Sequence, residues 1–500
     1  MLTYLQAHDP SKIAISDGVT TLSFGQLIER VEACCKWLNT LQIRRVLLID
    51  DNTVDWVVTD LACMALEITV IPLPTFFSAE QQQHVIEQVQ PEFIIAKRFL
   101  SLVAVENTPL TQLKGFRRNV KKAVEVPIGT QKITFTSGTT GNPKGVCLSK
   151  QNQLNVAVEL ANTIKIVAGS HLCILPLSLL LENVAGVYAA LIKGNSVTLL
   201  NESLRGFNGC QLVDGKQLLA ALSATNPTSI ILVPELLQYL IGSISRGWQV
   251  PERLSFVAVG GSKVSAQTLA QARQLGLPAY QGYGLSECGS VVTLNMQEEQ
   301  GDSIGNALNH VKIAIKNGTL HVQGNNFLGY VNQPDSWYPT EVDTEDLAKE
   351  TASGLIYLGR KKNTLVNSFG RNISPEWLES ELMATGLFRF VMVVGDAKPY
   401  CVGLVVPISD LLSDENIQRQ LVTVNQRLPE YAKINNIISL PSQLLTSSTY
   451  FTANGRPKRE AIEHYAQQTL NDIYLCDDTD IDELSNLHHT NCSQNSVINQ

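Results

Sequence analysis

The hydrophobic positions in the first hundred residues alternate between two spacings. Residues 24–40 place Leu27, Val31, Cys34 and Leu38 on one face of a helix. Short runs rich in Val, Ile and Leu are instead typical of buried strands. Strands that alternate with helices predict βαβ units and a mostly parallel sheet. In order, the pattern predicts a helix at 24–40, a strand at 45–49, a helix at 55–66, a strand at 68–74, a helix at 79–89 and a strand at 92–96.

The same alternation continues beyond residue 150, and the spacing changes near residue 303. From about 303 the pattern becomes short strands joined by turns, and the Asn317-Gly318 pair is typical of a tight hairpin. We therefore predict an α/β fold in which mostly parallel sheets flanked by helices are followed by a β-rich subdomain. The later elements are predicted as a helix at 151–166, strands at 197–200, 228–233 and 254–259, and a helix at 265–275.

The chain is expected to divide into a large and a small domain, because 500 residues exceed what one core usually holds. A polar junction begins at residue 361. It separates the N-terminal domain at 1–360, with its β-rich subdomain at about 303–360, from a small α+β domain at 361–470. Residues 471–500 are acidic and then rich in Asn, Ser and His. This composition predicts a disordered tail, and its acidic and histidine residues lack the ligand spacing of a metal site.

Composition and charge narrow the class of protein. A hydrophobic content of 44% with 17% charged residues is typical of a globular protein, and a net charge of -8 argues against nucleic acid as the main partner. The ten cysteines are scattered without a C-x-x-C pair, which favours reduced thiols. The longest apolar run, around 172–181, is too short for a membrane helix, and the N-terminus has no signal-peptide pattern. We expect a cytoplasmic protein with no transmembrane segment.

The most informative stretch is a loop rich in glycine and hydroxyl groups at 136–145, which reads TSGTTGNPKG. An apolar, β-branched lead-in at 133–135 predicts a strand before it. Glycines let backbone N–H groups crowd around an anion, hydroxyls add donors, and Lys144 adds positive charge. The alternative is a solvated linker, but that combination is typical of a phosphate-binding loop. The nucleotide-loop pattern G-x-x-x-x-G-K-[ST] is absent from the sequence.

A second informative segment, at 280–287, reads YQGYGLSE. An aromatic ring beside glycines can lie flat on a purine, and a following Ser and carboxylate can meet a phosphate and its metal. The alternative is a strand-end turn with a buried tyrosine. Upstream, a predicted strand ends at Gly260-Gly261-Ser262.

The loop at 136–145 and the segment at 280–287 resemble, in sequence and order, the signature motifs of the acyl-adenylate-forming enzymes, closest in pattern to medium- and long-chain acyl-CoA synthetases. The resemblance covers about residues 20–465. It implies that Tyr283 is the adenine platform, that Ser286 contacts the α-phosphate and that Glu287 is the Mg²⁺ ligand. The other ATP- and AMP-binding residues that it implies in these segments are Thr136, Ser137, Gly138, Thr139, Thr140, Gly141, Lys144, Gly260, Gly261, Ser262, Gly282 and Gly284.

Two further segments fit the same resemblance. Thr344-Glu345-Asp346, followed by Gly359-Arg360, is similar to the family's ribose-binding segment, with Asp346 on the ribose hydroxyls and Arg360 on ribose or phosphate. Glu345 replaces the usual glycine there. Lys362 aligns with the hinge about which the small domain rotates between the two half-reactions. Beyond it, Ser368 and Gly370 are expected to line the thiol tunnel after rotation.

Three positions depart from the family pattern. Where the family places a catalytic lysine, this chain has Arg456, with Lys458 two residues later. Arg456 substitutes for the lysine, or Lys458 reaches into the site, or adenylation is slow. Asn363 stands where an acid is common, and Leu179 stands where long-chain acyl-CoA synthetases usually have a histidine. The residues implied in catalysis are Lys144, Glu287, Arg456 and Lys458.

The resemblance implies ATP-dependent activation of a carboxylic acid to acyl-AMP, release of pyrophosphate, and transfer to the thiol of CoA, with Mg²⁺. Gly284, which lacks a side chain, suggests an open pocket floor, so we expect a medium- or long-chain fatty acid and a role in fatty acid metabolism. One alternative acceptor is the phosphopantetheine arm of an acyl or peptidyl carrier protein. A catalytically impaired nucleotide- or acyl-adenylate-binding homologue is the alternative from another class.

Overall fold

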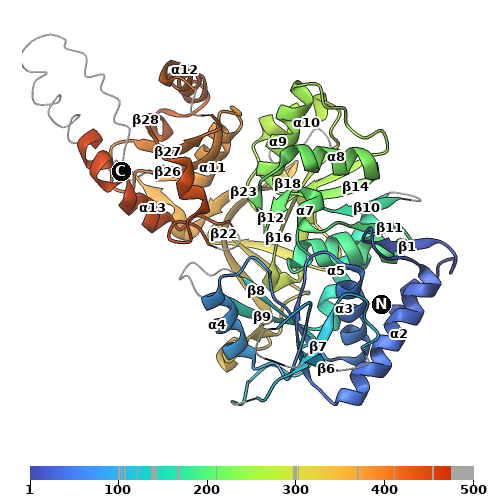
Figure 1. Cartoon of the computed structure of the whole chain (residues 1–500). Coiled ribbons are helices and arrows are strands. Elements are labelled where there is room, and N and C mark those ends of the chain that lie inside the picture. The colour runs from blue at the N-terminus through green and yellow to red at the C-terminus, as the bar shows by residue number, and fades with distance from the viewer. Residues whose placement is uncertain are drawn as a thin grey trace, which may run out of the picture.

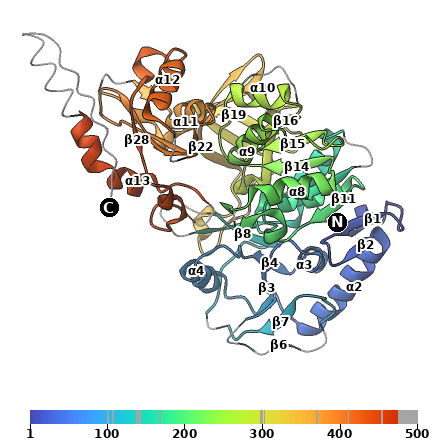
Figure 2. The same ribbon diagram turned by 45° about the horizontal axis from the view of Figure 1, so that its top comes forward.

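The structure is a computed structural model. It describes residues 1–99, 102, 104–105, 108–120, 122–136, 143–165, 169–209, 211–296, 301, 303–368, 371–409, 412–452 and 455–474. The chain forms a large body and a smaller C-terminal body, drawn orange to red, that stands beside it in both views (Figures 1 and 2). The α/β fold class predicted from the sequence is confirmed. Within the described ranges, no helix is long and apolar enough to cross a membrane.

A sheet of eight described strands holds the two flanks of the loop at 136–145. Its centre is parallel, whereas β8 and β9 run antiparallel and pair Thr136 with Lys144. The strand β9, between the loop and the next helix, was not anticipated from the sequence. In spatial order the strands are β21 (Gly329–Tyr330), β9 (Lys144–Leu148), β8 (Lys132–Thr136), β4 (Thr69–Pro72), β3 (Arg45–Ile49), β5 (Phe93–Ala96), β7 (Lys114–Arg117) and β6 (Ala104–Val105).

A larger sheet of thirteen described strands is parallel from β1 to β16 along its inner run and antiparallel beyond β16. Most of the β-rich segment after residue 303 extends this sheet, whereas β21 pairs with β9 in the smaller sheet. In spatial order the strands are β19 (Lys312–Lys316), β20 (Thr319–Gln323), β22 (Glu341–Thr351), β23 (Gly354–Arg360), β18 (Ser303–Ala307), β17 (Ser290–Leu294), β16 (Ala279–Leu285), β15 (Phe256–Val259), β14 (Ser229–Leu232), β10 (Ser170–Cys173), β11 (Ser196–Leu199), β1 (Ile13–Ser16) and β2 (Thr21–Ser23).

The helices of the large body begin where the sequence offers caps. Ser23, Ser78 and Ser149 each accept a hydrogen bond from the backbone three residues on, which satisfies an otherwise unpaired N–H group. The helices are α1 (Leu2–Leu5), α2 (Phe24–Leu41), α3 (Val54–Leu66), α4 (Ala79–Val89), α5 (Lys150–Thr163), the π-helix η1 (Leu181–Tyr188), α6 (Ala189–Ile192), α7 (Glu202–Arg205), α8 (Gly215–Thr225), α9 (Pro234–Ser245) and α10 (Ala266–Gln274). Short elements at the site are β12 (Phe207–Asn208), β13 (Gln211–Leu212), η2 (Ser286–Cys288), η3 (Pro334–Ser336) and η4 (Lys361–Asn363).

The C-terminal body is a small sheet packed between helices. Leu378 and Leu421, on α11 and α12, pack on one face of the sheet, and Ile462 on α13 packs on the other. The domain boundaries at 360/361 and 470/471 stay predictions. The elements are β24 (Leu365–Val366), β25 (Asn372–Ile373), α11 (Pro375–Met383), β26 (Phe388–Val394), β27 (Cys401–Pro407), α12 (Asp414–Asn425), η5 (Glu430–Ala432), β28 (Ile434–Ser439), η6 (Ser442–Thr446) and α13 (Arg459–Tyr465).

A buried ion pair ties the strand before the loop to two helices. Lys132 on β8 lies 2.9 Å from the Asp60 carboxylate on α3, and both side chains are fully buried. The Lys132 ammonium also donates to Asn183 and to the Tyr188 hydroxyl, both on η1, at 2.5 and 2.9 Å. Burial lowers the pKa of Lys132, and the Asp60 carboxylate opposes that shift. The network fixes β8, which leads directly into the loop.

We predict that Lys132→Met lowers the free energy of unfolding by about 3–5 kcal/mol, because it leaves the Asp60 carboxylate buried without its cation. Urea denaturation followed by circular dichroism measures the change. The matched control is Lys150→Met, which breaks an exposed 3.9 Å pair with Glu67 and is expected to change stability by no more than about 1 kcal/mol. Equal unfolding midpoints for the two variants would contradict the assigned role of the buried pair.

Candidate active site

The two ends of the phosphate-loop motif lie side by side, because Thr136 on β8 pairs with Lys144 on β9. Thr136 lines the main cavity, and the Lys144 ammonium lies 5.5 Å from the centre of the Tyr330 ring. Ser137, Gly138, Thr139, Thr140 and Gly141 lie outside the described residues, so their predicted contacts stay predictions.

A cavity of about 900 Å³ lies on one face of the larger sheet. The strands are parallel and in register here, so its lining residues form rows. The row at the amino ends of the strands contains His171, Ser229 and Phe256, which are paired neighbours. Val233 and Gly260 line the cavity at the carboxyl ends. From Ser229 to Val233 there are four residue steps, which span roughly 13 Å.

Helices cover this cavity, and the C-terminal body closes the end of the cavity that lies at the carboxyl ends of the strands. After the carboxyl end of β10 the chain forms η1 and α6, which run back toward the amino end of β10. Leu181, Ala185 and Ala189 on these helices line the cavity. At the carboxyl ends, Phe390 and Arg456 of the C-terminal body complete the lining. The Gln211 amide donates to the Leu445 carbonyl across the two bodies, at 3.1 Å. The site is therefore built from both bodies.

The residues implied for adenine and ribose meet at the carboxyl end of β16. The Tyr283 hydroxyl donates to the Asp346 carboxylate at 2.7 Å, and Arg360 pairs with the same carboxylate at 2.9 Å. Burial raises the pKa of Asp346, while Arg360 and Tyr283 oppose the shift. Gly260, Gly261, Ser262, Gly282, Gly284 and Ser286 line the cavity beside Tyr283. Segments about sixty residues apart in the sequence thus form one surface.

The structure explains the glycine at position 284 differently from the sequence analysis. A Cβ atom at this position would collide with the Ser290 carbonyl oxygen of the neighbouring strand β17. The two strands change register between Tyr283 and Gly284, which brings their backbones together. Gly284 does line the cavity, but a side chain is excluded by the backbone of β17. The expectation that Gly284 marks an open pocket floor was therefore wrong in its cause.

Glu345, which replaces the usual glycine, keeps a glycine-like backbone. Its φ angle is 56°, in the left-handed region that costs a non-glycine residue roughly 1–2 kcal/mol. Its N–H group donates a hydrogen bond to the Asp343 carboxylate at 3.0 Å. The turn before Asp346 is therefore preserved despite the substitution.

Glu287 lies on η2 beside the cavity, and a residue that the sequence analysis missed contacts it. The Tyr330 hydroxyl donates to the Glu287 carboxylate at 3.0 Å. Tyr330 follows Gly329 in a short strand, and only the fold brings it to the site. A single carboxylate next to a polyphosphate site is the donor set that Mg²⁺ usually takes, so Glu287 fits a magnesium ligand.

Four cationic side chains gather around the carboxyl ends of the strands. Partial burial and the neighbouring Arg360 lower the pKa of the Lys362 ammonium. Glu345 opposes this lowering, while Arg456 and Lys144 add to it, so the Lys362 ammonium lies in the field of three other cations. Surrounding protein and Arg360 likewise lower the pKa of Arg456, which faces the cavity and remains charged as arginine does. This arrangement suits a polyanion such as a triphosphate.

The structure separates the two candidate cations of the C-terminal body. Arg456 lines the cavity, and the Glu287 and Asp346 carboxylates oppose the lowering of its pKa. The Lys458 ammonium instead donates to the Ser448 carbonyl at 2.7 Å, and Lys458 is not among the described residues that line the cavity. Ser368 is exposed on the C-terminal body and is likewise not among them; Gly370 lies outside the described residues.

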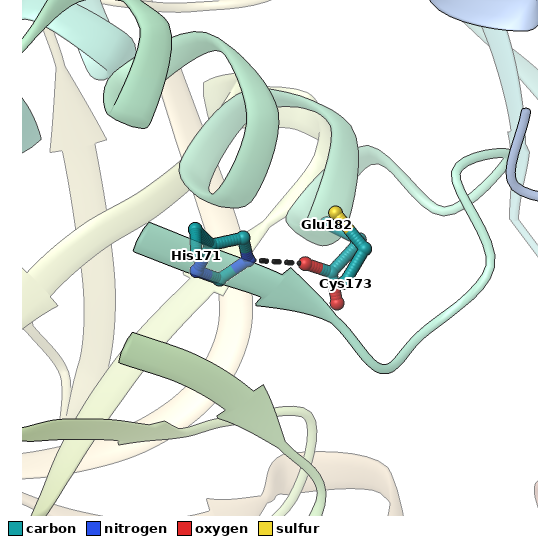
Figure 3. Close-up of side chains that lie close together, drawn as sticks. All are labelled: His171, Cys173 and Glu182. Carbon is teal, nitrogen blue, oxygen red and sulfur yellow. Dashed lines mark hydrogen bonds and ion pairs between the residues drawn. The ribbon is translucent and has the colours of Figure 1, made fainter. Parts of the chain in front are cut away.

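His171, Cys173 and Glu182 form a buried cluster in the cavity wall, with the first two on β10 and Glu182 on η1 (Figure 3). Their ligand atoms lie within 4.8 Å of one another. The Glu182 carboxylate already contacts His171 Nε2 at 2.7 Å and accepts from the Leu175 N–H at 2.9 Å, and His171 Nδ1 contacts Ser229 at 3.0 Å. We interpret the cluster as a hydrogen-bonded part of the wall rather than an open metal site.

Residues 4–331 match the family of AMP-binding enzymes. The chain belongs to this family. A 2-succinylbenzoate–CoA ligase of Staphylococcus epidermidis is 25% identical over 393 residues, which cover 74% of this chain and 78% of that protein. This AMP-binding enzyme therefore belongs to the acyl-adenylate-forming superfamily that its motifs resemble, and it is an AMP-forming acid–thiol ligase.

Solved structures of other ligases share the fold of this AMP-binding enzyme. The anthranilate CoA ligase AuaEII, in complex with anthranoyl-AMP, has a TM-score of 0.77 at 14% identity and covers 93% of this chain and 96% of its own. The o-succinylbenzoate CoA synthetase MenE of Bacillus subtilis, with ATP and magnesium, has a TM-score of 0.70 at 21% identity and covers 92% and 98%. ATP, Mg²⁺ and CoA are the cofactors and cosubstrates of such ligases.

We predict that Gly284→Ala destabilises the AMP-binding enzyme by about 3 kcal/mol, because the new methyl group meets backbone that cannot move aside. The matched control is Gly282→Ala on the same strand, where the nearest atom to a Cβ is 3.4 Å away. That variant is expected to change the free energy of unfolding by less than about 1 kcal/mol. Urea denaturation of both variants checks the difference, and equal stabilities would mean that β17 can yield.

Proposed function

We propose that this chain activates an apolar, extended monocarboxylic acid to acyl-AMP and transfers the acyl group to the thiol of CoA. The single observation that carries the proposal is the cavity along the sheet. Arg456 lines the cavity at the carboxyl ends of the strands, with Glu287 and the other gathered cations close by, and a mainly apolar wall runs from there along the strands.

The proposed chemistry solves the problem of a poor leaving group. The acid's carboxylate attacks the α-phosphate of ATP, and pyrophosphate leaves, so the acyl group becomes bonded to AMP. Lys144, Arg360 and Lys362 neutralise charge on the phosphates, while Arg456 stabilises charge where the carboxylate meets the α-phosphate. Bound Mg²⁺ supplies further neutralisation of the phosphates at Glu287. In the second step the thiol attacks the acyl carbon, and AMP leaves.

The chain's own residues hold the nucleotide in place for this step. Tyr283 offers its ring to the adenine, and Asp346 offers its carboxylate to the ribose hydroxyls after Tyr283 and Arg360 have oriented it. Ser286 and Thr136 add hydroxyl donors near the phosphates. Lys362 is the proposed hinge residue, and Ser368 and Gly370 are proposed to reach the thiol path only after the C-terminal domain rotates.

The cavity favours an extended apolar acid over a dicarboxylic one. Among its described lining residues, Lys193 is the cation near the amino ends of the strands, while Arg389 and Arg456 belong to the C-terminal body. The wall between them is mainly apolar, and Leu179 adds to it in place of the usual histidine. A second carboxylate midway along the wall would be buried without a partner, which is costly. We therefore retain a medium- or long-chain fatty acid as the proposed substrate.

The relatives do not support a fatty acid or a role in fatty acid metabolism, because their names specify aryl acids, 2-succinylbenzoate and anthranilate. An aryl monocarboxylic acid is therefore the second candidate for the acid. The acceptor has an alternative as well: the phosphopantetheine arm of a carrier protein presents the same thiol chemistry as CoA. Arg456, Asn363 and Leu179 are the departures that motivate a catalytically impaired homologue.

A panel of acids in pyrophosphate exchange tests the proposed function. We expect exchange with octanoate and palmitate, weaker exchange with benzoate and anthranilate, and little with 2-succinylbenzoate or acetate. Ala189→Phe, which fills the cavity near the amino ends of the strands, is expected to suppress palmitate and spare benzoate. Exchange with acetate alone would contradict the proposed acid, and no acid-dependent exchange would favour the impaired homologue. Adding CoA or a phosphopantetheinylated carrier protein then identifies the acceptor.

We predict that Arg456→Ala slows acid-dependent exchange by roughly 10²- to 10³-fold, because it removes a charge that stabilises the transition state. Lys458→Ala is the matched control and is expected to change the rate by no more than about twofold, since its ammonium contacts Ser448. Arg456→Lys should retain more activity than Arg456→Ala, because it keeps the charge. A larger loss for Lys458→Ala than for Arg456→Ala would reverse the assignment.

A further inference from the structure

Tyr330 lies beside Lys144 because of how two short strands pair. Strand β21 runs antiparallel to β9, with Tyr330 opposite Val146. Lys144 is two residues before Val146, so it is the diagonal neighbour on the same face of the sheet. The Lys144 ammonium accordingly lies 5.5 Å from the centre of the Tyr330 ring, within reach of a cation–π interaction.

The hydroxyl end of Tyr330 contacts the short helix η2, which connects strands β16 and β17 of the larger sheet. Its hydroxyl donates to the Glu287 carboxylate on η2 at 3.0 Å, and the Phe327 N–H donates to the Glu287 carbonyl at 2.7 Å. Burial and the Glu287 carboxylate raise the pKa of the Tyr330 phenol well above its ordinary value, so the hydroxyl stays a donor. One side chain therefore joins the end of the phosphate loop to the candidate metal ligand.

The backbone around Tyr330 holds this side chain in position. The Tyr330 N–H donates to the Ser336 hydroxyl at 2.8 Å, and the Trp337 indole donates to the Tyr330 carbonyl at 3.0 Å. The Phe327 ring packs edge-on against it, with ring centres 4.9 Å apart. A side chain restrained from both sides can orient the groups that it touches.

We propose that Tyr330 is a positioning residue that sets Glu287 for the magnesium ion and Lys144 for the phosphates of ATP. The inference rests on the proposed function in taking Glu287 as the metal ligand. A hydrogen bond to one carboxylate oxygen fixes the plane of the carboxylate, as the outer partners of metal ligands usually do. The aromatic ring limits where the Lys144 ammonium can lie. The two contacts are separable, because only one of them needs the hydroxyl.

Two substitutions separate these contacts. Tyr330→Phe removes the hydrogen bond to Glu287 and keeps the ring, whereas Tyr330→Leu removes both. Calorimetric titration of ATP at a series of Mg²⁺ concentrations measures binding without turnover. We expect Tyr330→Phe to raise the Mg²⁺ concentration for half-maximal ATP binding roughly tenfold. Tyr330→Leu is expected to weaken ATP binding a further threefold or so even at saturating Mg²⁺.

The matched control is Tyr338→Phe, in the same segment. Its hydroxyl accepts from the Ile128 N–H at 2.6 Å, and the residue is 52% exposed. This variant is expected to keep the wild-type Mg²⁺ dependence. Wild-type Mg²⁺ dependence in Tyr330→Phe would overturn the proposal. The proposal would also be overturned if Tyr330→Phe weakened ATP binding equally at all Mg²⁺ concentrations and also lowered the melting temperature, because that result would indicate a general loss of stability. Failure of the proposed function is a separate result, because it is measured as missing acid-dependent exchange in the wild type.

Discussion

Like charges held close together are the constraint on which this site depends. Lys144 lies on β9, Arg360 on β23, Lys362 on η4 and Arg456 in the C-terminal body, and their mutual repulsion opposes that arrangement. The fold offsets the repulsion with Glu287 and Asp346 placed among them. The negative charge of a bound triphosphate would offset the remaining repulsion among these cations.

Local sequence motifs were enough to predict the family and the fold class. The hydroxyl- and glycine-rich loop and the tyrosine segment can be recognised from their own residues, and the family and α/β class that they indicated are confirmed. The nucleotide contacts assigned to them and to Asp346 stay predictions. Helix α4 occupies the predicted span 79–89, because Ser78 and Gln81 form its capping box. Local signals of this kind can be recognised before any tertiary contact is known.

What could not be predicted depends on distant contacts. Tyr330 stands in a plain turn sequence, and its role arises from a strand pairing almost two hundred residues away. Gly284 was interpreted as a missing side chain in a pocket, but the reason for it is the approach of a second backbone. The end of β10 and the start of the π-helix both fall within the apolar run at 172–181. They could not be predicted there, because apolar content alone does not distinguish a strand from a helix.

The π-helix η1 makes the helical wall of the cavity adjustable in a way that the sheet wall is not. In a π-helix the backbone bonds reach five residues instead of four, so one residue more than an α-helix needs is accommodated in each turn. Deleting a single residue there would return the segment to α-helical spacing, which changes the side chains that η1 presents to the cavity without disturbing a strand. A change of length in this one helix would therefore alter the helical wall of the cavity, while the strands that form its other wall stayed in place.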